Sequence, residues 1–435
     1  MTLEARKLQC PYDAATSSLV AVEAEVGLPR VLFVDDDPAI LDGLKNLLRR
    51  ERRRWEMVFA LGGQQALDEI AVEPFDVIVS DMRMPGIDGA MLLERVKREH
   101  PSTARIVLSG HAEREAVMRA VPVAHQFLSK PCDAGLLRNV VERAMRLQQR
   151  LASPRIRELV GSIERLPSDP QLYWQLTQCI QREDSGVADI AAIVERDPAM
   201  STKVLQLVNS AYFGLSRATT SVTRAVGYLG IDLLRSLALI QAVFSASRGA
   251  MPRCFDLERF QVRSVMRARI ASRIATRSSA EIVVTTAMLA GIGELVLALA
   301  NPTGFAEIEA EARWSKRTRV EVQKEILGLT HAEVGSYLLS LWGLPLAITE
   351  AVAFHLEPGA LGQTELGGIK GVAPSVHGGN DADDTIVALH VAEGLLSQHA
   401  GSDTGLDLDY LGRVRDLAEL PSWKAIVREE LERSP

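Results

Sequence analysis

Five short apolar runs alternate with amphipathic stretches between residues 30 and 150, and this alternation constrains the fold more than any other feature. The runs are VLFVD (31–35), WEMVFA (55–60), FDVIVSD (75–81), RIVLS (105–109) and HQFLS (125–129), and helical patterns begin near Pro38, Gln64, Asp88, Glu113 and Asp133. Strands that alternate with helices in this way predict a doubly wound, five-stranded parallel sheet with right-handed crossovers. We therefore expect an α/β domain over residues 30–150.

Polar residues stand where four of these runs end. Asp35 and Asp36 end the first run, Asp81 the third and Ser109 the fourth, and Lys130 follows the fifth. The carboxyl ends of parallel strands meet at one edge of a sheet, which is where ligands bind. Three carboxylates repel one another unless a hard cation lies among them, and Mg²⁺ prefers oxygen ligands. Taken alone, the first two acids could only cap the next helix, but the matching strand ends favour a magnesium site.

The segments VDDD, SDMRMPGIDG, VLSG and FLSKP are similar to the signatures of the receiver domain of bacterial response regulators, which has a flavodoxin-like fold. The resemblance covers about residues 30–150. It implies that Asp81 is the phosphoacceptor. It also implies that Asp35, Asp36 and Asp81 bind Mg²⁺ together with the backbone carbonyl of Arg83.

The same resemblance assigns roles to the last two strand ends. Ser109 would bond a phosphoryl oxygen, and Lys130 would pair with the phosphate. Phe127 would be the aromatic switch residue, where the commoner residue is tyrosine. Phenylalanine keeps the packing of that ring but lacks the hydroxyl contact. We also expect a cis peptide bond between Lys130 and Pro131, because cis forms persist at X-Pro bonds in tight functional turns.

The rest of the chain lacks strand alternation and is predicted to be helical. A helix from Asp133 to Arg150 forms a stiff connection, and an all-α domain follows over residues 151–400. Pro198, Pro345 and Pro358 divide that domain into short helices. We further expect a poorly ordered leader over residues 1–29, a surface loop over Leu361–Asp384, and a tail over 401–435 with a closing helix at Trp423–Glu432.

Three stretches of the helical part resemble the HDOD family, a helical relative of the HD-type metal phosphohydrolases that usually lacks their metal ligands. They are DPAMSTKVLQLVNSAYFG (197–214), TRAVGYLGIDLLRSLAL (223–239) and THAEVGSYLLSLWGLPLAITEAVAFH (330–355). Where true HD hydrolases carry an adjacent His-Asp pair, this chain has Ala290 and Gly291. His331 and His355 match more distant histidine positions. Without carboxylate partners, we interpret both as structural, and we expect no catalysis there.

An arginine series lies on one predicted helix. Arg259, Arg263 and Arg267 form one set at four-residue steps, and Arg269, Arg273 and Arg277 form another. Each set lies on one face of the helix and would suit an anionic nucleotide, nucleic acid or an acidic partner. The alternative is a solvated face with intramolecular ion pairs.

Composition limits the classes of function. The 435 residues carry a formal net charge of -7, which argues against a surface that grips nucleic acid throughout. Cys10, Cys132, Cys179 and Cys254 are far apart, as in proteins of a reducing cytoplasm. The longest apolar stretch, Ala287–Ala300, contains Glu294, and we expect no membrane insertion. The first residues lack a signal peptide pattern.

Together these patterns predict a cytoplasmic response regulator. A histidine kinase would phosphorylate Asp81, and the HDOD domain would signal through a downstream protein partner. A homodimer and a nucleotide ligand are both compatible with this hypothesis. The alternative is a receiver-controlled metal phosphodiesterase that acts on a signalling nucleotide. A DNA-binding regulator is the weakest alternative, because no basic module with a recognition helix follows the first domain.

Overall fold

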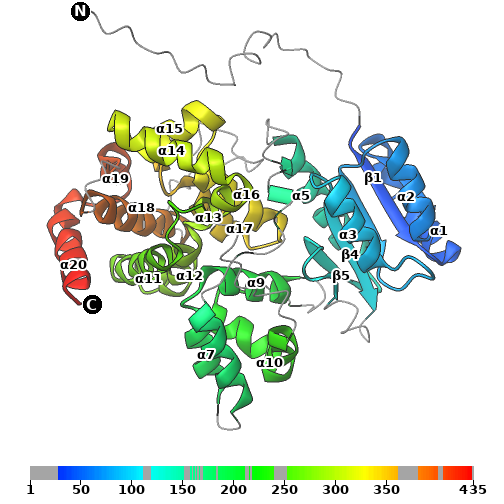
Figure 1. Cartoon of the computed structure of the whole chain (residues 1–435), viewed down its shortest axis with the longest axis horizontal. Helices are drawn as coiled ribbons and strands as arrows, with labels where there is room; N and C mark the ends of the chain where they lie inside the picture. Colours follow the sequence, from blue (N-terminus) through cyan, green and yellow to red (C-terminus); the bar gives the residue numbers. More distant parts are fainter. Residues whose placement is uncertain are drawn as a thin grey trace, which may run out of the picture.

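The chain forms an α/β part and a helical part that lie side by side in a computed structural model (Figure 1). The structure describes residues 28–110, 119–150, 157–158, 160–161, 163, 166, 170–182, 185–210, 215, 218–239, 252–360, 381–399 and 405–433. The expected leader lies almost entirely outside the described residues, as do the start of the helix expected near Glu113 and most of the loop expected after Leu361.

The α/β part contains one parallel five-stranded sheet, as the alternation predicts. Its strands are β1 (Arg30–Asp35), β2 (Glu56–Leu61), β3 (Val77–Asp81), β4 (Ala104–Gly110) and β5 (Gln126–Lys130). The order in the sheet is β2-β1-β3-β4-β5, with every neighbouring pair parallel. The central strands are buried on both faces, which explains why their sequences are continuous apolar runs of β-branched residues. The doubly wound fold is confirmed.

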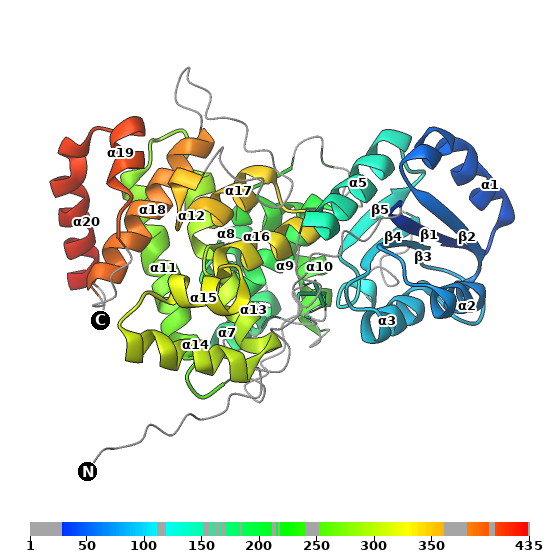
Figure 2. The ribbon, with the colours of Figure 1, turned by 90° about the horizontal axis from the view of Figure 1, so that it is seen from above.

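Helices cover both faces of this sheet. They are α1 (Pro38–Leu47), α2 (Gly63–Val72), α3 (Gly89–Glu99) and α5 (Ala134–Arg150). Helices α1 and α5 lie on one face and α2 and α3 on the other (Figure 2). Asp37 caps α1, where its carboxylate accepts a hydrogen bond from the backbone of Ala39 and Pro38 takes the first helical position. The peptide bond between Lys130 and Pro131 is cis, as expected.

The described residues after Arg150 form helices and short 3-10 turns. The α-helices are α7 (Pro170–Gln181), α8 (Val187–Val194), α9 (Pro198–Asn209), α10 (Val222–Leu239), α11 (Leu257–Ile274), α12 (Ala280–Leu289), α13 (Ile292–Ala300), α14 (Pro302–Ser315), α15 (Arg319–Leu327), α16 (His331–Leu341), α17 (Leu346–Phe354), α18 (Asp381–His399), α19 (Leu408–Val414) and α20 (Leu420–Arg433). The prolines at 198, 345 and 358 lie at element boundaries, as predicted.

Two expectations need correction. The loop expected to reach Asp384 ends earlier, because α18 already begins at Asp381. The stretch Ile282–Ala300 is long and apolar enough to span a membrane by length and composition, which the sequence reasoning denied. However, 78% of the stretch is buried inside the fold, and it comprises most of α12 and all of α13. Both helices are core elements of the helical part.

Candidate functional site

The polar residues at the strand ends converge at one edge of the sheet, as the sequence predicts. Asp35 ends β1, Asp81 ends β3, and Lys130 ends β5. The ammonium of Lys130 donates to Asp35 at 2.7 Å and also contacts the Asp81 carboxylate directly. Both carboxylates are buried, and one cation therefore links the ends of three strands.

Backbone amides hold both carboxylates in place. The amide of Asp37 donates to Asp35 at 3.0 Å, and the amide of Arg83 donates to Asp81 at 2.6 Å. Each amide lies two residues after its acid, where the chain turns out of the strand. The loop after each strand thus fixes the acid that ends it. The other oxygen of each acid faces Lys130.

Burial and charge act in opposite directions on these groups. Burial raises the pKa of Asp81, and Lys130 and the Arg83 amide offset this rise only in part. Burial alone would lower the pKa of Lys130, but its contacts with Asp35 and Asp81 outweigh burial and raise it. Lys130 is therefore a fixed cation at neutral pH, beside a carboxylate that is costly to ionise.

The residues at this edge suit Mg²⁺. Mg²⁺ binds through one or two carboxylates and keeps several waters, and Asp35 and Asp81 already lie within reach of one cation. Asp36 is exposed next to Asp35. In the part of the chain that the structure describes, no three His, Cys, Asp or Glu side chains come together as a metal site. Asp36 would therefore have to turn inward to act as a ligand.

The predicted switch residues lie on the two strands beside this cluster. Ser109 is fully buried near the end of β4, where it faces Ser129 of β5 across the ladder. Phe127 pairs with Val107 and is 1% exposed. Phe127 also lines a cavity of about 470 Å³ that Trp342, Gly343 and Arg143 share. The Phe127 ring therefore lies where the two parts of the chain meet.

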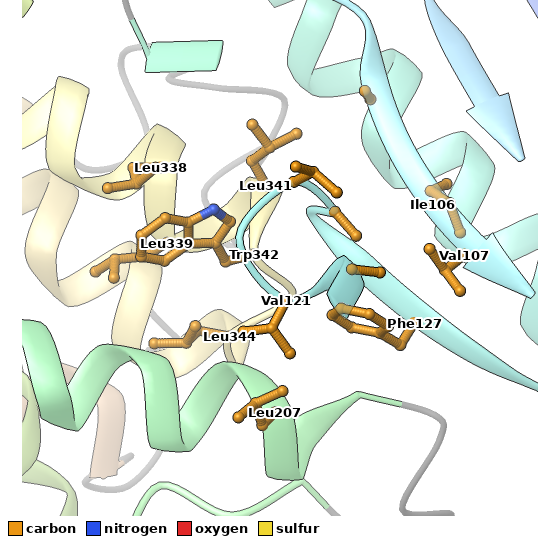
Figure 3. Close-up of a cluster of buried hydrophobic side chains, with 14 of the residues drawn as sticks. Ile106, Val107, Val121, Phe127, Leu207, Leu338, Leu339, Leu341, Trp342 and Leu344 are labelled. Atoms are coloured by element: carbon orange, nitrogen blue, oxygen red, sulfur yellow. The ribbon is translucent and has the colours of Figure 1, made fainter. Parts of the chain in front are cut away.

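This junction is a packed interface that sequence reasoning did not predict. Ile106, Val107 and Phe127 lie in one apolar cluster with Leu207 of α9 and Trp342 (Figure 3). Leu338, Leu339, Leu341 and Leu344 extend the cluster within the helical part. Because β4 and β5 supply one side of the cluster and helices supply the other, the two parts share a core.

Hydrogen bonds join β5 and α5 to the helical part. An edge strand presents unpaired backbone groups, and β5 is at the edge of the sheet. The side chain of Gln206 donates to the carbonyl of His125 at 3.0 Å, just before β5 begins. Gln126 donates to the carbonyl of Leu341 at 3.0 Å, and Arg143 of α5 donates to that of Leu344 at 2.6 Å. The turn between α16 and α17 is thus held by β5 and α5.

The arginine series does not form one open face, and Arg277 lies outside the helix on which it was predicted, because α11 ends at Ile274. Arg267 is buried, donates to the carbonyl of Ala287 at 2.7 Å, and pairs with Glu393 of α18 at 2.8 Å. Arg263 pairs with the same glutamate at 2.5 Å. Arg273 binds the last helix through Glu429 and Glu430 instead. The intramolecular alternative holds for these three arginines, whereas Arg259 stays exposed.

Arg267 also occupies the space next to Gly291. A side-chain carbon added at Gly291 would lie 3.1 Å from the Arg267 guanidinium and 3.0 Å from the Phe260 ring. Gly291 stands where HD hydrolases carry one residue of a metal-binding pair. In this chain the space beside Gly291 is filled by Arg267, which is already paired with Glu393.

The two histidines have partners inside the domain. His331 Nδ1 contacts the amide oxygen of Gln323 at 2.8 Å, and His355 Nδ1 donates to the carbonyl of Val352 at 2.8 Å. Burial lowers the pKa of His355 to about 3. His331 does have a carboxylate neighbour, contrary to expectation, because Nε2 lies 3.5 Å from Glu294. The sequence signal for this contact was Glu294 itself, the single acid within the apolar helix α13.

Comparisons with known proteins agree with this division of the chain. The sequence model of the response regulator receiver domain matches residues 31–142, and that of the HDOD domain matches residues 166–358. An uncharacterized protein of Treponema pallidum is 25% identical over 232 residues, which are 51% of this chain and 44% of that protein. The response regulator protein PilR of Pseudomonas aeruginosa is 32% identical over 120 residues, 27% of this chain and 26% of PilR.

The chain thus covers less than half the length of either curated relative. Among solved structures, the MmoQ response regulator from Methylococcus capsulatus is 22% identical, covers 60% of this chain and 98% of its own, and has a TM-score of 0.45. The two family matches, each over the residues where the sheet or the helices lie, identify the domains. The chain therefore contains a response regulator receiver domain over residues 31–142, followed by an HDOD domain over residues 166–358.

Proposed function

We propose that the chain is a phosphorylation-controlled switch, in which a histidine kinase phosphorylates Asp81 and the HDOD domain then changes its contact with a protein partner. One observation carries the proposal: the same two strands serve the acceptor cluster and the domain interface. Strand β4 carries Ser109 and Val107, and β5 carries Lys130 and Phe127. A change at the strand ends can therefore act directly on the interface.

The residues around Asp81 have distinct roles in this proposal. The Asp81 carboxylate attacks the phosphorus of the kinase's phosphohistidine, the P–N bond breaks, and the imidazole leaves with its electron pair. Lys130 neutralises charge on the transferred group. Asp35, Asp36, Asp81 and the Arg83 carbonyl would hold Mg²⁺, which supplies further positive charge to the phosphoryl oxygens when bound. The Arg83 amide and Lys130 keep the attacking carboxylate oriented.

Phosphorylation then loosens the interface. The phosphoryl group adds roughly one to two negative charges and three acceptor oxygens. The Ser109 hydroxyl donates to one of these oxygens and moves toward it. Phe127 rotates into the vacated space and leaves the cavity that it lines with Trp342. The α16–α17 turn loses an apolar contact, and the HDOD domain is released from the receiver.

A phosphodonor assay tests the acceptor. Wild-type protein incubated with acetyl phosphate and Mg²⁺ is expected to give a retarded band on a phosphate-affinity gel. Asp81→Asn is expected to give none. Asp88→Asn is the matched control. Asp88 caps α3 in the loop after β3, and asparagine can accept the same capping hydrogen bond. A retarded band in Asp81→Asn would contradict the proposal.

The output that we propose is protein interaction in the cytoplasm, through an HDOD domain that spans about residues 151–400. The support is the ion-paired Arg267 beside Gly291, where a hydrolase would hold metal. A metal phosphodiesterase makes the opposite prediction. Hydrolysis of bis-p-nitrophenyl phosphate with Mn²⁺, lost in His331→Ala, would contradict the non-catalytic output.

A further inference from the structure

The HDOD domain contains a cavity that the proposed switch does not use. Its volume is about 520 Å³, and it lies between α11, α13, α14 and the first residue of α15. Small-molecule sites in proteins have volumes of roughly 300–1,000 Å³ and combine apolar walls with a few polar groups. The cavity is thus large enough for one ligand of mononucleotide size.

One part of the wall is aromatic. Phe255, just before α11, lies with its ring centre 5.6 Å from that of Phe260 and 5.6 Å from that of Phe305 of α14. All three rings line the cavity. The Phe255 ring is tilted by 43° to Phe260 and by 64° to Phe305, so a planar ring of a ligand can stack on the face of one ring and contact the edge of another.

Two exposed arginines line the same cavity. Arg259 lies in the first turn of α11, and Arg313 lies in the last turn of α14. Within the described ranges, neither guanidinium forms an ion pair with a carboxylate. The nearby Asp256 accepts a hydrogen bond from the Arg259 backbone and caps α11. The Nε atom of Arg313 donates to the carbonyl of Glu309 at 3.3 Å, which leaves the terminal nitrogens of both guanidinium groups for an anion. Guanidinium groups bind phosphate through paired hydrogen bonds.

The acids near the cavity are already neutralised. Arg319 pairs with Glu294 at 2.9 Å and with Glu309 at 2.5 Å. Burial alone would raise the pKa of Glu294, but Arg319 and other cations outweigh burial and lower it. Glu393 lies behind the cavity and is shared by Arg263 and Arg267. The lining includes five arginines and three acids, so an anion meets a positive wall.

An unsatisfied donor lies in the same wall. The Nε atom of Arg263 is buried and has no hydrogen-bond partner. Buried N–H donors are nearly always paired, and an unpaired one calls for an explanation. If the Arg263 side chain turns toward the cavity on binding, a ligand oxygen supplies the acceptor, while the terminal nitrogen that binds Glu393 and Ser397 keeps these partners.

We propose that this cavity binds a small molecule that carries a phosphate group on a planar ring system, with the dimensions of a purine mononucleotide. The phosphate meets Arg259 and Arg313, and the ring stacks on the phenylalanine wall. The proposal does not rest on phosphorylation of Asp81, because the cavity and the acceptor lie in different domains.

Calorimetric titration of the full chain tests the ligand class. The probes are AMP and GMP, with guanosine and inorganic phosphate as partial ligands. At least one purine nucleotide is expected to bind saturably and at least tenfold more tightly than either partial ligand, because only the nucleotide engages arginines and aromatic rings together. No nucleotide binding, or equal binding of inorganic phosphate, would overturn the proposal.

Single substitutions locate the site. Arg259→Gln and Arg313→Gln are each expected to weaken nucleotide binding by about fivefold or more, since each removes charged hydrogen bonds to the phosphate. Both residues are exposed, so the fold should persist. Arg269→Gln is the matched control: it removes an exposed arginine from the same helix, outside the cavity. Binding that is unchanged in the Arg259→Gln and Arg313→Gln double variant would refute the site.

Discussion

Lys203 is a buried cation at the domain interface, and its surroundings disfavour its charge. Its ammonium lies 4.2 Å from the centre of the Trp342 ring and donates to Gln206 at 2.9 Å. Burial, with a smaller contribution from Lys97 of the receiver, lowers the pKa of Lys203 to about 7. Between about pH 7 and pH 10.5, the ordinary pKa of lysine, Lys203 is therefore protonated in the unfolded chain but neutral in the folded chain.

The first prediction concerns this residue and pH. Because the folded pKa is depressed, stability should rise as pH increases from 7.5 to 8.5, by at most about 1.4 kcal/mol per pH unit from one group. Lys203→Met should remove this slope while keeping the apolar stem against Trp342. Urea unfolding of both proteins at the two pH values measures it. Equal slopes in wild type and variant would show that Lys203 stays protonated.

Asp81 is expected to cost stability in the resting protein. Its pKa is raised by burial, so the folded state binds a proton more readily than the unfolded chain, and stability falls as pH rises above 3.8. Asp81→Asn should therefore raise Tm at pH 7 in the presence of a metal chelator. Asp88→Ala, which removes the cap of α3, should instead cost about 1 kcal/mol. A lower Tm for Asp81→Asn would contradict this assignment.

The convergence of the polar residues at the strand ends could be predicted because its signals are local. Asp35, Asp81, Ser109 and Lys130 each stand at the end of an apolar run, and parallel strands bring such ends together. The partner of Arg267 could not be predicted in this way. Glu393 lies 126 positions along the chain, and no local pattern indicates which acid a buried arginine will meet.

At the scale of elements, the turn between α16 and α17 connects the two domains. Gly343 adopts a φ of 77° there, and a side-chain carbon at this position would lie 3.4 Å from the Gln126 side chain. The turn also carries Trp342 and Leu344 into the shared core. Its geometry thus has to suit both the helix pair and the receiver.

Gly343→Ala and Gly328→Ala form a matched pair of substitutions. Both glycines have a positive φ, and alanine in this region costs about 1 kcal/mol or more. A carbon at Gly328 meets open space, whereas one at Gly343 makes an ordinary van der Waals contact with the Gln126 side chain, so a backbone shift at Gly343 acts on the receiver. Both variants should lose stability in thermal unfolding, but only Gly343→Ala should raise amide hydrogen exchange in β5. Equal exchange in the two variants would argue against docking through this turn.

The sequence also predicted the boundaries of the five strands to within two residues, yet it did not indicate which face of the receiver the helices cover. The apolar residues of β4 and β5 read as an ordinary sheet core, and those of α9 and α16 as an ordinary helix core. Because both sets are continuous in one cluster, each pattern is satisfied by partners in the other domain. Periodicity reports that a face is buried, but it does not report what covers it.

At the scale of the whole molecule, the two domains form one continuous core in this structure. The receiver and the HDOD domain lie side by side along the long axis of the molecule, with β5 and α5 at the junction (Figures 1 and 2). A switch of this kind has to change the balance between docked and released forms. Going from 1:99 to 99:1 requires about 5.5 kcal/mol of preference for one form.

Hydrogen exchange of the segment Leu338–Leu344 tests the central claim most directly. Wild-type protein with beryllofluoride and Mg²⁺, which mimic the phosphoryl group on Asp81, should exchange this segment faster than untreated protein. Asp81→Asn should show no response to the same treatment, whereas Asp88→Asn should respond like wild type. The account predicts this release of the α16–α17 turn from β5. Unchanged protection in treated wild type, or an equal response in Asp81→Asn, would contradict it.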